Sequence, residues 1–318
     1  MFMDCSKTKQ DFENFVENHL GADKLKQLKN IHRGGINNLK GAQYEQYYLL
    51  FKTFEIANNA TLDLSKQYLE TQVYGFVDDI AYIDKQNNIK YSYQAKNSNG
   101  QTADWNNEQE QRFLQQRKID LDFFGFSDSY CYLLVSDIRK ADINKTKITH
   151  TNFTCEFFPY HTKVVDLLGH KPFKEYIDNL IEPNATLADR NYATSLILGI
   201  LSNDEFGSIQ NIFENAQSEA YPNPFIKFRK SNQPIPDWLT KYLEGLKLQV
   251  QYELHYGRLK VKFEQGLELS VDVDTLPNQS PTQNPTMEQL IALLMQCSMK
   301  KLQNPNKWEN PNEHLSSI

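Results

Sequence analysis

The spacing of apolar residues changes several times along the chain, and each change predicts a different element. Over residues 8–30, apolar side chains occur at mixed intervals of three to five among charges, which predicts a helix. Arg33-Gly34-Gly35 then indicates a turn or loop. From Leu39 to Ala57, tyrosine and phenylalanine recur at intervals of three and four, so we expect a second helix with one buried face.

The next stretch alternates with a period of two, which is typical of β-strands. We expect a strand from Tyr68 to Ile83, a polar turn at 84–88 and a second strand from Ile89 to Ala95, forming a hairpin. A very polar helix over 104–118 and a continuous apolar strand from Tyr130 to Val135 follow. This order predicts an α/β (α+β) fold with a mixed sheet flanked by helices.

The pattern changes after about residue 150, so we expect a domain over residues 1–150 and a second over 151–318. The second domain should combine helices with an antiparallel β-meander. Its expected elements are a connector and helix at 164–181, a buried helix at 187–201, a meander at 246–273 with turns at His255-Tyr256-Gly257 and Gln265-Gly266, a loop at 277–285, a helix at 287–302 and a frayed tail from 304.

Composition places the 318-residue chain among folded, water-soluble proteins, since 40% of its residues are hydrophobic and 23% are charged. The net charge of -6 lacks the basic surplus that phosphate contacts usually bring. A DNA-binding function would therefore need its basic residues gathered on one face. No apolar run approaches the ~20 residues that a transmembrane helix needs, and the start does not resemble a signal peptide. We expect a cytoplasmic protein without a membrane partner.

The four cysteines, Cys5, Cys131, Cys155 and Cys297, are far apart and show no CxxC spacing. This spacing argues against a zinc site and against a disulfide framework. We expect buried, inert thiols.

The residues with the clearest chemical pattern lie in the predicted hairpin. Gln94 and Lys96 are two positions apart in one strand, so they share a face of the sheet. Pairing with the first strand would bring Asp79 beside them, and Asp78 would take that place after a shift of one residue. The alternative is a solvated polar strand face, but these residues interrupt otherwise apolar and aromatic strands in register.

This set suits the hydrolysis of a phosphodiester. Mg²⁺ prefers hard oxygen ligands, which the Asp79 carboxylate and the Gln94 amide carbonyl can supply. Lys96 can orient water or stabilise developing negative charge. Glu45 on the preceding helix is a further metal ligand if that helix packs across the hairpin, and otherwise it is a solvated carboxylate.

Gly41-Ala42, Tyr44-Glu45, Asp78-Asp79-Ile80 and Tyr93-Gln94-Ala95-Lys96 together resemble the PD-(D/E)XK superfamily. More narrowly, they resemble its Mrr-like branch with a QxK motif and the effector nuclease domains of bacterial antiphage systems. The resemblance covers roughly residues 30–140 and implies a restriction-endonuclease-like fold. It also implies Glu45, Asp79, Gln94 and Lys96 as catalytic residues, with Gln94 in place of the family's usual glutamate.

We therefore expect an endonuclease for double-stranded DNA that uses Mg²⁺ or Mn²⁺ and acts in antiphage defence. The alternative is a nuclease-fold subunit that binds DNA or a partner without cutting. Residues 151–318 resemble no family, so control by a nucleotide second messenger does not carry over. We expect this part to regulate the nuclease, to form a homo-oligomer or to dock on a partner protein of a defence operon.

Overall fold

The computed structural model describes residues 8–35, 39–97, 100–183, 185–202, 207–220, 223–228, 234–246, 249–255, 257–282 and 285–299. The chain divides into two compact units. Unit 1 consists of the residues up to Asn179 together with Ala185–Ser218, and unit 2 consists of Leu180–Asn184 and the residues from Glu219 on. Among the described residues, no helix combines the length and the apolar character needed to cross a bilayer.

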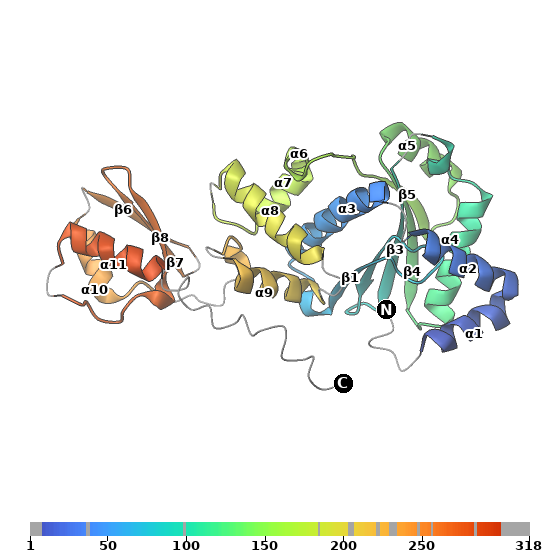
Figure 1. The fold of residues 1–318 in the computed structure, drawn as a ribbon, viewed down its shortest axis with the longest axis horizontal. Helices are drawn as coiled ribbons and strands as arrows, with labels where there is room; N and C mark the ends of the chain where they lie inside the picture. The colour runs from blue at the N-terminus through green and yellow to red at the C-terminus, as the bar shows by residue number, and fades with distance from the viewer. Residues whose placement is uncertain are drawn as a thin grey trace. The chain divides into compact units, whose positions relative to one another are not determined.

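Unit 1 contains a five-stranded sheet and nine α-helices within the described residues (Figure 1). In chain order its elements are α1 (Lys9–Leu20), α2 (Ala22–Gly35), α3 (Leu39–Asn58), η1 (Leu64–Lys66), β1 (Gln67–Thr71), β2 (Ile80–Asp84), β3 (Ile89–Lys96), η2 (Gln101–Ala103), α4 (Asn107–Asp122), β4 (Asp128–Val135), α5 (Ile138–Lys147), β5 (Phe153–Phe157), α6 (Val164–Leu167), α7 (Lys171–Asp178), α8 (Leu187–Leu201) and α9 (Ile209–Glu219).

The sheet is mixed, with the strand order β1-β2-β3-β4-β5. β1, β2 and β3 pair antiparallel, whereas β3, β4 and β5 pair parallel. Each parallel connection contains a helix, α4 after β3 and α5 after β4, as parallel pairing requires. The carboxyl ends of β3 and β4 consequently meet at one edge of the sheet.

Helices cover both faces of this sheet (Figure 1). On one face α3 packs through Tyr48, whose ring lies 5.2 Å from that of Tyr93 on β3. On the other face α4 packs through Phe113, which belongs to a buried cluster with Cys131 and Leu133 of β4. Odd-numbered residues of β3 therefore face α3, and even-numbered residues, including Gln94 and Lys96, lie on the α4 face.

Unit 2 contains η3 (Ile226–Phe228), α10 (Asp237–Gly245), β6 (Val250–His255), β7 (Arg258–Phe263), β8 (Glu268–Asp272), η4 (Val273–Thr275) and α11 (Met287–Met299). The three strands form an antiparallel meander in the order β6-β7-β8. Alternate residues Leu259, Val261 and Phe263 are buried in one cluster with Leu290 and Leu294 of α11. The alternation in the sequence therefore identified the apolar face of this meander.

Several predicted elements are confirmed. The helix from residue 39, the turn at 84–88, the strands at 89–95 and 130–135, the helix at 187–201 and the meander are all present. The turn at Gly266 is confirmed, while Tyr256 of the other turn, residues 300–302 and the tail from 304 lie outside the described residues. Cys131, Cys155 and Cys297 are buried, and Cys5 lies outside the described residues.

Other predictions are wrong at the level of element boundaries. The helix over 8–30 is two helices, because Gly21 adopts a positive φ of 94° between α1 and α2. α2 continues to Gly35, so the expected turn at Arg33-Gly34-Gly35 is helical. The predicted helix at 164–181 is two short helices, α6 and α7. The pattern also failed to predict α5, β5, α9 and α10.

The predicted strand over 68–83 is two strands, β1 and β2, which pair with each other. Residues 72–79 loop out between them, with backbone hydrogen bonds from Gln72 N to Asp79 O (3.1 Å) and from Val73 N to Asp78 O (2.7 Å). Asp79 therefore lies just before β2 and not in the middle of a long strand.

The domain boundary expected at residue 150 does not match the structure. A cut there would separate β5 from β4, with which it pairs from Cys131↔Phe153 to Val135↔Phe157. Apart from Leu180–Asn184, the division between the two units lies after Ser218. The period of the apolar pattern could not show that β5 belongs to the first sheet, because the pairing of β5 with β4 joins residues far apart in the chain.

Candidate active site

Asp79 is held by two hydrogen bonds at the point where β2 begins. The register of β2 on β3, with Ile80 opposite Tyr93, places Asp79 opposite Gln94. The Gln94 side-chain amide donates through Nε2 to Asp79 Oδ2, and the backbone N–H of Ala95 donates to the same oxygen at 2.6 Å. The predicted proximity of Asp79 and Gln94 is therefore present, and it arises from strand pairing.

Arg112 of α4 forms one polar cluster with Asp78, Asp79 and Gln94. The sequence motifs did not identify this arginine. Its guanidinium donates to Gln94 Oε1 at 2.6 Å and to the backbone carbonyl of Phe76 at 2.9 Å. It also lies 3.4 Å from Asp78 Oδ1, and its side chain is only 12% exposed. Arg112 thus places a partly buried positive charge against both Asp78 and Gln94.

Glu45 reaches the cluster from α3, although α3 covers the opposite face of the sheet. Its Oε2 accepts a hydrogen bond of 3.0 Å from the side chain of Gln72, the first residue after β1. Gln72 has a φ of 50°, which is uncommon for a residue other than glycine. This backbone reversal turns Gln72 toward Glu45 and begins the loop that leads to Asp79.

The three carboxyl groups influence one another electrostatically. Burial, and next the charge of Asp79, raise the pKa of Glu45 to about 7. The same two causes raise the pKa of Asp78 to about 7. Burial also raises the pKa of Asp79, against the lowering effects of Lys96 and the hydrogen bond from Ala95. Such mutual repulsion in a confined space is typical of functional sites and of unneutralised acidic clusters.

Lys96 ends β3 and is half-buried. Its positive charge lowers the pKa of Glu45, Asp78 and Asp79, so it lies within electrostatic range of all three. In the part of the chain that the structure describes, its ammonium group makes no ion pair and no side-chain hydrogen bond. Asp79 and Gln94 are therefore hydrogen-bonded neighbours, and Glu45 and Lys96 lie within electrostatic range of Asp79.

The carboxylates near Asp79 are candidate ligands for a divalent metal ion. No group of three or more Asp, Glu, His or Cys side chains that could hold a metal ion occurs among the described residues. Mg²⁺, however, is often held by one or two carboxylates together with water and substrate phosphate. Asp79 Oδ1 and Glu45 Oε1 take no part in the hydrogen bonds above. Carboxylate oxygens are hard donors of the kind that Mg²⁺ or Mn²⁺ prefers.

Gln94, which the sequence predicts as a metal ligand, is hydrogen-bonded on both sides of its amide. Its carbonyl oxygen accepts from Arg112, and its amide nitrogen donates to Asp79. A half-turn of the amide would set its NH₂ group against the guanidinium, which has only donors. Gln94 therefore bridges Asp79 and Arg112 in this geometry, and one of the two lone pairs of its carbonyl oxygen is engaged by the guanidinium.

Arg112 and Gln116 carried a signal that could have been found in the sequence. With Asp120 they stand at intervals of four in α4, so they share one face of that helix. A polar helical face beside a buried sheet implies polar partners on the strands, because buried polar groups are almost always hydrogen-bonded. The sequence analysis predicted a very polar helix here and assigned no partners to its polar face.

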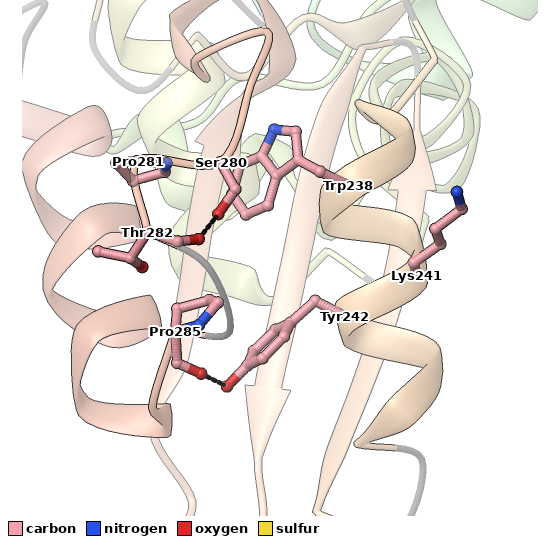
Figure 2. Close-up of a pocket in the computed structure, with 7 residues that line it drawn as sticks. All are labelled: Trp238, Lys241, Tyr242, Ser280, Pro281, Thr282 and Pro285. Atoms are coloured by element: carbon pink, nitrogen blue, oxygen red, sulfur yellow. Dashed lines mark hydrogen bonds between the residues drawn. The ribbon is translucent and has the colours of Figure 1, made fainter.

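Unit 2 contains a separate cavity of about 530 Å³ beside α10 (Figure 2). Trp238 and Tyr242 line it, and each donates a hydrogen bond to a proline carbonyl, Pro277 O at 2.9 Å and Pro285 O respectively. The lining residues include no carboxylate, histidine or cysteine. These aromatic side chains therefore contact Pro277 and Pro285, and the described lining residues form no acid–base or metal-binding cluster.

No protein-family model, curated protein or solved structure matches the chain. What this protein does is therefore inferred from its own residues.

Proposed function

We propose that this chain is a metal-dependent phosphodiester hydrolase that cuts DNA, with its site where β2 begins and β3 ends. The observation that carries the proposal is the setting of Asp79. This buried carboxylate is held by Gln94 and by the backbone of Ala95. The charge of Lys96 lowers the pKa of Asp79, and the charge of Asp79 raises the pKa of Glu45, so both side chains lie close to it.

Each residue has a distinct role in this proposal. Asp79 and Glu45 would hold a divalent ion, which when bound would neutralise phosphate charge and lower the pKa of a coordinated water. Lys96 provides a compact positive charge for the scissile phosphate or for the attacking water. Gln94 orients Asp79, because its amide has one partner on each side.

Basic residues near the site favour a polyanionic substrate, although the chain as a whole has a net charge of -6. α5 begins three residues after Val135, which pairs with Lys96 at the end of β3. Arg139, Lys145 and Lys147 of this helix are exposed. Arg139, in the first turn of α5, is the nearest of these to the sheet edge that carries the site, and local charge matters more for phosphate binding than the net charge.

The finer parts of the proposal depend on the motif resemblance described above. Double-stranded DNA as substrate, and a role as effector in antiphage defence, come from the likeness of Tyr44-Glu45, Asp78-Asp79 and Gln94-Ala95-Lys96 to the PD-(D/E)XK superfamily. The mixed sheet with helices on both faces is the architecture expected for such a domain. Unit 2 would regulate the nuclease, oligomerise or bind a partner.

One observation favours the alternative of a binding subunit that does not cut. The Arg112 guanidinium holds Gln94 Oε1, so one expected metal ligand is already engaged by a cation of the chain. In that reading Arg112 neutralises the acidic cluster permanently. The fold would then serve to bind DNA or a partner protein.

Cleavage of supercoiled plasmid by the purified full-length chain distinguishes the two. We expect nicked and linear products with Mg²⁺ or Mn²⁺, none with EDTA, and none from Lys96→Ala with either ion. DNA binding without cleavage, in every metal condition and at varied protein concentration, would support the binding subunit instead. Cleavage that Lys96→Ala leaves unchanged would point to a contaminating nuclease or to a site elsewhere.

A further inference from the structure

The loop that carries Asp78 and Asp79 is attached to α4 through one side chain. The backbone N–H groups of Phe76 and Val77 both donate to Gln116 Oε1, at 2.8 and 3.1 Å. Phe76 and Val77 are fully buried. Since buried N–H groups need partners, Gln116 satisfies two consecutive backbone donors immediately before the two aspartates.

The loop sequence makes room for this amide. At Gly75 an added Cβ would lie 2.5 Å from Gln116 Oε1, closer than such atoms can approach. The absence of a side chain at Gly75 therefore allows Gln116 to reach the two N–H groups. A glycine at this position has a packing reason that is independent of its backbone flexibility.

A buried ion pair fixes the other end of the same amide. Gln116 Nε2 donates to Asp120 Oδ1 at 2.8 Å, and this carboxylate also accepts from Lys90 Nζ at 2.6 Å and from Ser129 Oγ at 2.7 Å. The Lys90 and Asp120 side chains are both 0% exposed. Because an ionised carboxylate only accepts, the Gln116 NH₂ group must face Asp120, and its oxygen must face the loop.

These contacts link β3 to the loop by a continuous path. Lys90 lies on the same face of β3 as Gln94, four residues earlier. The path runs from Lys90 through Asp120 and Gln116 to the backbone before Asp78, while Arg112 on the same helix face contacts the Phe76 carbonyl. Two adjacent buried aspartates repel each other, so their loop needs such an attachment to stay near Gln94.

We propose that Gln116 is a positioning residue, which holds the Asp78–Asp79 loop in the arrangement that the hydrolase site requires. What the loop is positioned for rests on the proposed function. That the loop is positioned by Gln116 rests on the hydrogen bonds and the glycine contact alone. The two can therefore be tested separately.

The test compares Gln116→Met with Gln115→Met in the full-length chain. Both variants remove an amide of the same size from neighbouring positions of α4. Gln115 is also buried, at 8% exposed, and its Oε1 has no hydrogen-bond partner within the described residues. Gly75→Ala is a second, independent way to displace the Gln116 amide, and it is informative if Gln116→Met does not fold.

Three readouts are needed: hydrogen exchange of a peptide spanning residues 74–79, Mn²⁺ binding measured by calorimetry, and turnover of plasmid DNA. We expect Gln116→Met and Gly75→Ala to lose exchange protection in this peptide. We also expect Mn²⁺ affinity and kcat to fall about 10–100-fold, as for other residues that support a site indirectly, with KM for DNA unchanged. Gln115→Met should match the wild type in all three.

Exchange protection in Gln116→Met equal to that in Gln115→Met would overturn the proposal. So would a loss of activity in both variants to the same extent, because that would indicate general destabilisation. If the wild type does not cleave DNA, the proposed function fails. The exchange comparison still decides whether Gln116 holds the loop.

Discussion

The amide of Gln94 lies between a carboxylate and a guanidinium, donating through Nε2 to Asp79 Oδ2 while its Oε1 accepts from Arg112. Both partners are charged, so these hydrogen bonds are of the stronger kind. This bridge joins β3 to the start of β2 and to α4. It makes Asp79, and not Asp78, the carboxylate that faces the Gln94-Ala95-Lys96 strand.

Asp79→Asn should therefore reduce cleavage more than Asp78→Asn. Asp79 Oδ2 accepts from both Gln94 and the Ala95 backbone, and an amide at this position would lose acceptor capacity and negative charge together. The Asp78 carboxyl has a longer contact of 3.4 Å to Arg112. The initial rate of plasmid cleavage with Mg²⁺ measures the effect of each substitution. A larger loss in Asp78→Asn would show that Asp78 holds the metal.

Lys96→Ala should abolish cleavage while the melting temperature changes little. Lys96 is half-buried, and its ammonium makes no ion pair within the described part of the chain, so its removal breaks few native contacts. Cleavage rate and thermal unfolding are measured on the same preparation. Lys118→Ala, on the exposed side of α4, is the control and should behave as the wild type. If Lys96→Ala cleaves about as fast as the wild type, Lys96 has no role in cleavage and is only a surface charge.

Glu45→Gln should stabilise the metal-free protein at pH 8 more than at pH 5. Burial and the charge of Asp79 raise the pKa of Glu45 to about 7, whereas an unfolded glutamate titrates near about 4.3. Between these values the folded chain holds a proton that the unfolded chain has released. The free energy of unfolding therefore falls as pH rises through this window, and the loss is complete above it.

Melting temperatures in EDTA at the two pH values test this expectation. Glutamine carries no charge at either pH, so the variant should avoid the loss that the wild type shows at pH 8. Glu17→Gln, at an exposed position of α1, is the control and should not gain stability selectively at pH 8. An equal gain for Glu45→Gln at pH 5 and pH 8 would contradict the assignment of a raised pKa.

Asp120→Asn should strongly destabilise unit 1. It leaves Lys90 fully buried without its counter-charge, and breaking one side of a buried pair typically costs about 3–5 kcal/mol. Asp128→Asn disturbs the more exposed pair with Arg117, for which about 1 kcal/mol or less is expected. Denaturant unfolding of both variants provides the comparison. Similar midpoints would mean that the buried pair contributes no more than the exposed one.

Truncation after residue 150 should not yield a folded nuclease, whereas residues 1–218 should fold. The shorter fragment lacks β5, and β4 would be left with an unpaired edge. The longer fragment keeps the sheet and almost all of α9. Circular dichroism and thermal unfolding compare the two fragments.

The same longer fragment tests whether unit 2 regulates the site. If residues 1–218 and the full chain cleave at equal rates and depend on the same conditions, unit 2 is not a regulator.

The sequence alone was enough to predict the elements whose patterns are local. The helix from Leu39, the strand from Ile89 and the meander of unit 2 repeat with clear periods, and periodicity depends on near neighbours in the chain. The spacing of Gln94 and Lys96 placed both on one strand face for the same reason. Proximity of Asp79 to Gln94 also followed, because hairpin pairing is a short-range relationship.

Tertiary structure decided what depends on residues far apart in sequence. The period-two pattern continued through 72–79, yet Gln72 reverses the backbone there, and Gln116, about 40 residues later, holds the resulting loop. The sequence did not predict that Arg112, from another element, would donate to the carbonyl of Gln94. A side chain's partners across helices and strands are set by packing, which the spacing of residues along one segment does not encode.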